Sequence, residues 1–267
     1  MNKNKFFKTL TVTLTFVIFI FQNLALCANN YEKIDGKAFY KSLSKRLGRN
    51  RSDYPNLSDD EFANFREVIT TGIARGKLFR SSTPVDNWGN RNLIADKYSE
   101  KFGVKTFINL ADTQKILINR PNFYDTYYSR QAYICLNLNL KFQSKIFKNG
   151  LSKGIKFMAA NEPPFLIHCS LGKDRAGIVC ALIECLAGAS LDEVMDDYML
   201  SFFNYFGIVE NSSEYDFVVN REIKTHLAKV LGVKNLENVN LKIAAEKYFK
   251  SIGVSDYDIK ILREKLN

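Results

Sequence analysis

The most reactive combination of side chains in this chain lies in one short loop, within residues 165–177. The loop joins an apolar strand to an apolar helix and contains Cys169 and, six residues later, Arg175. A loop that enters a helix N-terminus directs backbone N–H groups and the helix dipole at one point, which suits an anion. A cysteine there is favoured as the nucleophilic thiolate, and an arginine can bind two oxygens of one phosphate. The loop therefore predicts nucleophilic attack on a phosphate ester.

The full pattern of the loop is His168-Cys169-x-x-Gly172-Lys173-Asp174-Arg175-x-Gly177. It resembles the Cys-x5-Arg loop of the protein tyrosine phosphatase superfamily. Its form is most similar to bacterial phosphatases that act on phosphotyrosine and phosphoinositides. Segments that are similar to other parts of that group are 64–66, 76–82, 197–201 and 248–266. The resemblance thus covers residues 60–267.

The resemblance implies a two-step mechanism without a metal or another cofactor. Cys169 would attack phosphorus and form a phosphocysteine, while Arg175 and the backbone amides of residues 170–175 hold the phosphate oxygens. His168 would orient the loop and support the thiolate. The expected substrate-binding positions in the loop are Ser170, Leu171, Gly172, Lys173, Ala176 and Gly177.

A general acid must protonate the leaving oxygen, and two aspartates are candidates. Asp112 follows an apolar strand, so we expect it at the same sheet edge as the loop, and we place it first. An aspartate after a strand is also a common turn residue. Asp174 lies inside the loop, and the resemblance implies that it could share the task.

Two features depart from the family pattern. Position 176 is alanine, where the family usually has a threonine or serine hydroxyl that supports the thiolate and breakdown of the phosphoenzyme. Its absence predicts slower turnover without loss of binding. The family's Trp-Pro-Asp loop is also missing, since Trp88 is the single tryptophan and no Pro-Asp pair follows it. Lys173 is interpreted as a second cation at the pocket mouth, the alternative being a solvated loop lysine.

The elements that must position the loop alternate between strands and helices. Strands are expected at 65–68, 77–82, 104–110, 132–138 and 165–168, and helices at 91–102 and 141–160. Further helices are expected at 175–186, 191–205, 213–231, 241–249 and 255–266. This order predicts an α/β fold with a central, mostly parallel sheet flanked by helices and a helical C-terminal part. We expect a catalytic domain over 60–267 and an N-terminal arm over 28–59.

The first 27 residues have the pattern of a secretory signal peptide. Lys3, Lys5 and Lys8 precede an apolar run over 10–21, and small residues follow near Cys27. The prediction is a secreted or cell-envelope protein, with an uncleaved membrane anchor as the alternative. The apolar run is short for a full membrane span.

Charge and cysteine content narrow the range of partners. Removing the three leader lysines lowers the formal net charge from +10 to +7, which favours anionic partners. We expect a monomer that acts on a phosphorylated protein, a phosphoinositide or an inositol phosphate, with peripheral contact to anionic membranes. Nucleic acid is not expected, because the basic residues are scattered. Cys135, Cys180 and Cys185 lie in apolar stretches and are interpreted as free thiols.

Three other functions are alternatives to this prediction. A phosphate-binding module without turnover would use the same loop, and Ala176 leaves room for it. Sulfur transfer also uses a cysteine in an anion loop, although Gly172 and Arg175 fit phosphate better. A serine hydrolase is disfavoured, because no Gly-x-Ser-x-Gly motif is present and the chain has 2 histidines.

Overall fold

The computed structural model describes residues 31–87 and 89–267, so the predicted signal peptide lies outside the described residues. The strands are β1 (Arg66–Glu67), β2 (Leu78–Ser81), β3 (Thr106–Asn109), β4 (Ala132–Cys135) and β5 (Phe165–His168). The helices are α2 (Gly36–Arg46), α3 (Asp59–Phe62), α4 (Asn92–Lys101), α5 (Gln114–Ile118), α6 (Lys145–Ala160), α7 (Asp174–Ala187), α8 (Leu191–Phe206), α9 (Ser213–Phe217), α10 (Thr225–Leu231), α11 (Leu241–Ser251) and α12 (Asp256–Leu266). A π-helical segment, η5 (Val218–Lys224), joins α9 to α10. Short turns of 3₁₀ helix are η1 (Tyr31–Lys33), η2 (Arg51–Asp53), η3 (Phe123–Asp125) and η4 (Tyr128–Arg130).

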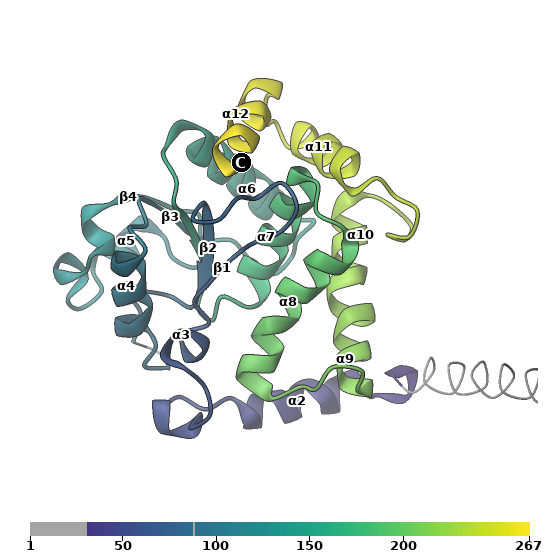
Figure 1. The fold of residues 1–267 in the computed structure, drawn as a ribbon, viewed down its shortest axis with the longest axis horizontal. Coiled ribbons are helices and arrows are strands. Elements are labelled where there is room, and N and C mark those ends of the chain that lie inside the picture. The colour runs from purple at the N-terminus through teal and green to yellow at the C-terminus, as the bar shows by residue number, and fades with distance from the viewer. Residues whose placement is uncertain (1–30, 88) are drawn as a thin grey trace, which may run out of the picture.

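The five strands form one sheet in the order β1-β2-β5-β3-β4. Figure 1 shows this sheet between α4 and α7. β1 pairs antiparallel with β2, and all other pairs are parallel. β5 is therefore the central strand, and its last residue, His168, is level with Ser81 of β2 and Asn109 of β3. The predicted strands and the mostly parallel α/β fold are confirmed. The register places the loop after β5 at the middle of the carboxyl edge of the sheet.

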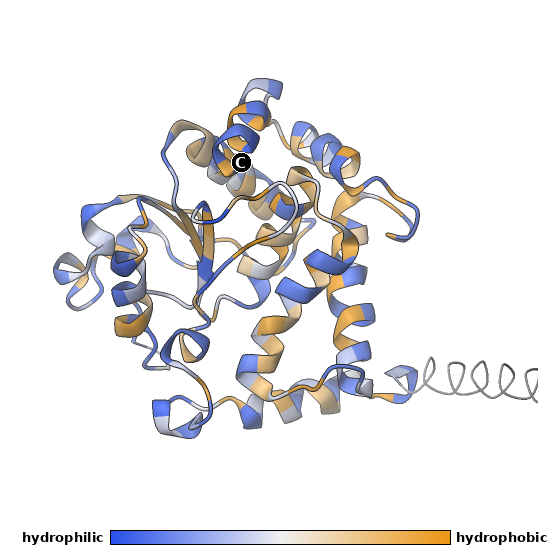
Figure 2. Ribbon diagram, viewed as in Figure 1, coloured by the Kyte–Doolittle hydropathy of each residue, from blue (hydrophilic) through white to orange (hydrophobic). Residues whose placement is uncertain are grey.

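Helices cover both faces of the sheet. On one face α6 and α7 pack on side chains such as Ile108 and Ile167, and α12 and α11 pack outside them. On the other face α4 and an aromatic cluster cover Phe79, Phe107 and Leu166. Figure 2 shows the strands and α7 as the hydrophobic centre of the molecule. A loop between β5 and α7 is thus anchored at both ends in the core.

Glycines end several C-terminal helices. Gly188, Gly207 and Gly232 lie in the left-handed region at the ends of α7, α8 and α10, where a side chain would be strained. The helix expected over 213–231 differs from the structure, because η5 interrupts it. This segment buries Val218, Val219 and Ile223, and its wider turns were not expected from the helical periodicity.

Two details at α4 and α5 differ from the sequence interpretation. α4 lies within the helix expected over 91–102, but its apolar residue Leu93 is 77% exposed, and its buried positions include the polar Ser99 beside Ala95. The sequence pattern did not predict α5, which is five residues long and capped by Thr113. Short segments of this kind carry too few periods to stand out from a loop.

The residues before the sheet wrap around the helical side of the molecule. α2 buries Phe39 and Leu43, and the Phe39 ring lies 4.8 Å from that of Phe217. Arg46 forms an ion pair with Glu214.

Within residues 31–87 and 89–267 there is no helix with both the length and the apolar character that crossing a membrane requires.

Candidate active site

The loop after β5 is held in a tight turn against the neighbouring strand. Cys169 follows the last residue of β5 and is 3% exposed. Gly172 has φ +69°, and a Cβ there would lie 2.2 Å from the backbone oxygen of Ser81. Only glycine permits this approach. The loop therefore lies directly on the end of β2, with Cys169 at its base.

The carbonyl oxygens of the loop accept hydrogen bonds on the side away from the candidate pocket. Leu171 O accepts from Asn64 Nδ2 (3.0 Å) and from the hydroxyl of Tyr205 (2.7 Å). Gly172 O and Lys173 O accept from Arg80 Nη2 at 2.8 and 3.1 Å. Because a peptide unit is planar and trans, each following N–H points the opposite way. The amides of Gly172, Lys173 and Asp174 thus point away from these donors, and amides are the groups that an oxyanion site uses.

A buried ion cluster fixes the arginine that holds these carbonyls. Arg80 is fully buried and pairs with Asp197, which also accepts from Arg66 Nε at 2.8 Å. Burial alone would raise the pKa of Asp197, but Arg66 and Arg80 hold it below its usual range. A Cβ at Gly177 would lie 2.6 Å from Tyr198 and 3.0 Å from Arg80 Nη2. Gly177 therefore acts behind the loop, where it leaves space for Arg80.

Arg175 folds back over the loop and has donors left for a ligand. Its Nη1 donates to the carbonyl oxygens of Leu110 (3.3 Å) and Leu138 (3.2 Å), and its Nη2 donates to Ser170 Oγ (3.0 Å). A guanidinium carries five N–H donors. At least two therefore have no hydrogen bond within the described residues, one on Nη2 and one on Nε. The Nε–Nη2 edge of a guanidinium matches two phosphate oxygens.

His168 is buried under the loop as a neutral side chain. It is 0% exposed, and its Nε2 lies 3.3 Å from the hydroxyl of Tyr128. Burial lowers the pKa of His168 to about 4. Its Nδ1 has no hydrogen-bond partner among the described residues, and the imidazole carries no positive charge near neutral pH.

This burial predicts a loss of stability in mild acid. Below pH 6.5, the usual pKa of histidine, the unfolded chain takes up a proton that folded His168 refuses until about pH 4. Between these pH values the protein should therefore lose up to about 3 kcal/mol that a His168→Gln variant does not lose. Urea unfolding of both proteins across this range measures the difference. His226→Gln is the control, and parallel curves for wild type and His168→Gln would contradict the prediction.

The two candidate acids lie in different surroundings. Asp112 is 4% exposed, and its carboxylate accepts from Arg120 Nη2 at 2.7 Å and from Asn109 Nδ2 at 3.1 Å. Arg120 also pairs with Asp86 at 3.1 Å. Asp174 is the first residue of α7, and its side chain is 43% exposed. The structure thus offers one enclosed and one accessible carboxyl group.

Lys173 and Ala176 are both enclosed by the protein. Lys173 is 8% exposed, pairs with Asp174 and holds its ammonium 4.5 Å from the ring centre of Phe202. Ala176 is 0% exposed, and its methyl side chain supplies no hydroxyl to the loop. Ser170 and Leu171 are half-buried in the loop itself.

The other cysteines of the described chain differ from Cys169 in environment. All are free thiols, which confirms the interpretation of Cys135, Cys180 and Cys185. Burial raises the pKa of Cys135 to about 12 and raises those of Cys180 and Cys185 even further. Such thiols stay protonated and unreactive. Cys169 alone among them precedes a helix N-terminus with exposed amides.

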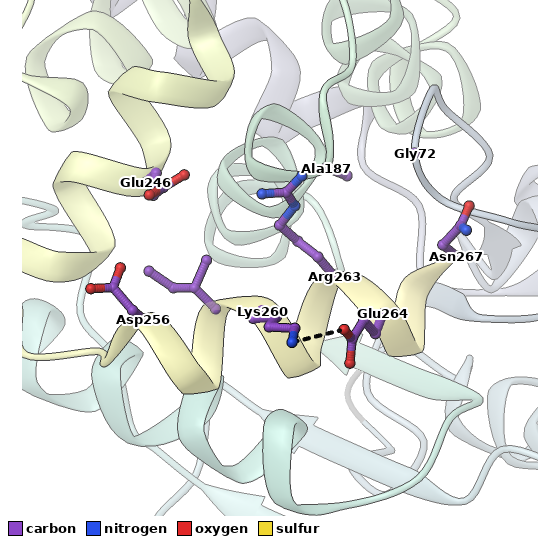
Figure 3. A pocket seen from close by; sticks show the side chains of 9 residues that line it. Gly72, Ala187, Glu246, Asp256, Lys260, Arg263, Glu264 and Asn267 are labelled. Carbon is purple, nitrogen blue, oxygen red and sulfur yellow. Dashed lines mark ion pairs between the residues drawn. The ribbon is translucent and has the colours of Figure 1, made fainter.

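The residues described by the structure contain no group of three or more His, Cys, Asp or Glu side chains that could hold a metal ion. A separate cavity of about 520 Å³ lies beside α12 and includes Ala187, the last residue of α7 (Figure 3). The loop is at the other end of α7, which is about 20 Å long. Figure 3 shows Arg263 among Glu246, Asp256 and Glu264 in this cavity. It is therefore distinct from the Cys169 site.

The asparagine and the charged residues that support the loop from behind were not assigned by sequence reasoning. Asn64, Arg66, Arg80 and Asp197 fall in segments that resembled the family, but no role followed from the resemblance. One indication was present: Arg80 is a charged residue within β2, a strand whose four residues are all buried. A fully buried arginine requires an anionic or carbonyl partner nearby.

Comparison with known proteins identifies the part of the chain that carries this loop. Residues 136–267 match the model of a tyrosine phosphatase family. A tyrosine-protein phosphatase of Nostoc commune is 29% identical over 126 residues, which cover 42% of this chain and 42% of that protein. The match therefore spans less than half of the curated relative.

Two solved structures are similar at lower levels. The core catalytic domain of the PP-IP phosphatase SIW14 from S. cerevisiae is 22% identical, covering 62% of this chain and 91% of that chain with a TM-score of 0.38. A second structure of the Siw14 catalytic core is 20% identical, covering 62% and 94% with a TM-score of 0.33. By the family model and the curated relative, residues 136–267 of this chain are similar to tyrosine phosphatases.

Proposed function

We propose that this protein is a secreted phosphatase that hydrolyses phosphate monoesters through a phosphocysteine on Cys169. The observation that carries the proposal is the loop itself. Three of its carbonyl oxygens accept hydrogen bonds from Asn64, Tyr205 and Arg80, so the following amides point away from these side chains. A preorganised set of amides stabilises the charge of a phosphoryl transition state without reorganisation.

In the first step, the Cys169 thiolate attacks phosphorus and an S–P bond forms as the ester P–O bond breaks. The leaving alkoxide takes a proton from a carboxylic acid. In the second step, the resulting carboxylate removes a proton from water, and the water oxygen attacks phosphorus. The S–P bond breaks, inorganic phosphate leaves and the thiolate is restored. The free edge of Arg175 would hold two of the phosphate oxygens throughout.

We place Asp112 first as the general acid. It follows β3 at the carboxyl edge, where Leu110 O also contacts Arg175. Its ion pair with Arg120 must open before the carboxyl group can carry and donate a proton. The shared contact of Arg120 with Asp86 gives the arginine a second carboxylate to hold when that happens.

Asp112→Asn should lower kcat by about a hundredfold on a phosphotyrosine peptide, since it cannot donate or remove a proton. The effect should be smaller on p-nitrophenyl phosphate, because its leaving group needs less protonation. Asp112→Asn should also flatten the pH dependence of kcat. Asp174→Asn is the matched control in the loop. A larger loss in Asp174→Asn would reverse the assignment.

The proposed function is tested by phosphate release and by trapping of the intermediate. Reduced protein from residue 28 onward is incubated with a phosphotyrosine peptide, a phosphoserine peptide, phosphoinositides and inositol hexakisphosphate. Acid-quenched samples are digested, and peptide masses show whether Cys169 carries a phosphoryl group. Release together with phosphorylated Cys169 supports the proposal. Phosphate binding without release from any substrate would overturn it in favour of a phosphate-binding module.

A further inference from the structure

A surface beside the active site combines lysines with exposed apolar side chains. We call it the basic face and define it by Leu140, Lys141, Lys145, Ile146 and Lys148. Leu140 is 59% exposed and Ile146 is 62% exposed. Lys141 and Lys145 are exposed and Lys148 is half-buried. None of the three lysines forms an ion pair with a residue that the structure describes.

The local sequence leaves this positive charge uncompensated. Residues 126–161 contain no aspartate or glutamate, while they contain five lysines and one arginine. The helix α6 begins at Lys145 after its cap Ser144, so two lysines occupy its first turns without an acid. Cations at the positive end of a helix dipole are unfavourable. This arrangement costs stability in isolation, and an anionic surface would relieve the cost.

More lysines adjoin the basic face from α10. Gln143 Nε2 donates to Lys229 O at 2.6 Å, which joins the loop before α6 to α10. A hollow there is lined by Leu140, Lys141 and Lys229, among others. Lys224, Lys229 and Lys234 line the next hollow along α10, together with the single acid Glu237. The positive surface is thus wider than one helix end.

The basic face is next to the candidate active site. Leu138 O accepts a hydrogen bond from Arg175 Nη1 at 3.2 Å. Leu140 is two residues further along, at most about 7 Å away along the chain. The loop over 136–144 and the start of α6 lie at the carboxyl edge of the sheet, as the Cys169 loop does.

We propose that the basic face docks this protein on an anionic lipid bilayer and so brings the Cys169 loop to phosphate groups at the membrane surface. The negative surface potential of an anionic bilayer attracts lysines. Neighbouring exposed leucine and isoleucine side chains can enter the boundary of the acyl region. An acidic protein would satisfy the lysines but gives no role to isolated apolar side chains among them. The docking is argued from the residues of the basic face alone, while hydrolysis at the membrane rests on the proposed function.

The test measures binding to vesicles of phosphatidylcholine with and without phosphatidylserine, whose phosphodiester is not a phosphatase substrate. The protein used in the test starts at residue 28, because the apolar stretch 10–21 would itself bind lipid. All residues that the structure describes are kept. The charge variant is Lys141→Gln with Lys145→Gln and Lys148→Gln. The matched control is Lys97→Gln with Lys101→Gln and Lys105→Gln, which removes three exposed lysines at and after α4 on the other face of the sheet.

Wild type and the control should bind phosphatidylserine vesicles, and added salt should weaken the binding. The charge variant should bind about a hundredfold more weakly. Leu140→Ser with Ile146→Ser should also weaken binding while leaving its salt dependence unchanged. Equal binding by the charge variant and the control, or no binding by wild type, would overturn the proposal. So would displacement by soluble polyglutamate together with no effect of the two serine substitutions.

Activity separates the docking from the proposed function. The charge variant should hydrolyse soluble p-nitrophenyl phosphate at the wild-type rate and lose activity only on phosphoinositides in vesicles. Hydrolysis of the soluble ester without vesicle binding by wild type would reject the docking and keep the phosphatase. Vesicle binding without hydrolysis of any substrate would keep the docking and reject the phosphatase.

Discussion

Cys169→Ser should lower the rate of phosphate release by at least about 10⁴-fold, a loss typical of removing a nucleophile. A serine hydroxyl at this position has no base to ionise it, since His168 lies within the core with Tyr128 as its hydrogen-bond partner. The phosphate-binding groups remain, because the amides and Arg175 are held by other residues. The variant should therefore bind inorganic phosphate or a phosphopeptide about as well as wild type. Calorimetric titration beside a phosphate-release assay measures both properties.

Cys135→Ser is the matched control for this substitution. Cys135 lies at the end of β4, and its thiol has a pKa raised to about 12, so it should contribute nothing to catalysis. The control should release phosphate at the wild-type rate. Substantial release by Cys169→Ser would contradict the covalent mechanism, and loss of phosphate binding by that variant would contradict the independent support of the loop.

The sequence predicted the main strands and the loop that joins β5 to α7 well, for a physical reason. Cys169, Gly172 and Arg175 lie within one short segment, so their proximity follows from their spacing along the chain. The apolar strand before them and the apolar helix after them identify the flanking elements. Local chemistry of this kind can be read from one sequence.

The support behind the loop could not be predicted in the same way. Asn64 contacts Leu171 across 107 residues of chain, and Arg80 contacts Asp197 across 117. Which of many charged residues meet over such separations depends on the packing of whole helices on the sheet. The same limit applies to Asp112, whose place after a strand was evident but whose partner Arg120 was not.

The two arginines behind the loop make its geometry dependent on one carboxylate. Arg66 and Arg80 both contact Asp197, and the Arg80 side chain is fully buried. Glu184 lies in the same buried region, but burial raises its pKa well above the usual range, and its carboxyl oxygens have no hydrogen-bond partner among the described residues. Asp197 is therefore the anion on which both arginines depend.

Asp197→Ala should destabilise the protein by about 3–5 kcal/mol, because it leaves two buried guanidinium groups without their counter-charge. Freed from Asp197, Arg80 should also hold Gly172 O and Lys173 O less firmly, so activity per folded molecule should fall together with phosphate affinity. Urea unfolding and phosphate titration measure the two effects.

Asp196→Ala is the matched control, since this neighbouring side chain of α8 is exposed. It should change stability by no more than about 0.5 kcal/mol.

Arg80→Met gives a second test that does not leave Asp197 between two cations: it removes one buried charge and keeps the Arg66 pair. It should therefore cost less stability than Asp197→Ala but as much phosphate affinity, because both variants release the same loop carbonyls. Equal stability of Asp197→Ala and Asp196→Ala would show that the arginines find other partners, and the loop would then owe its shape to Gly172 and the strand ends alone.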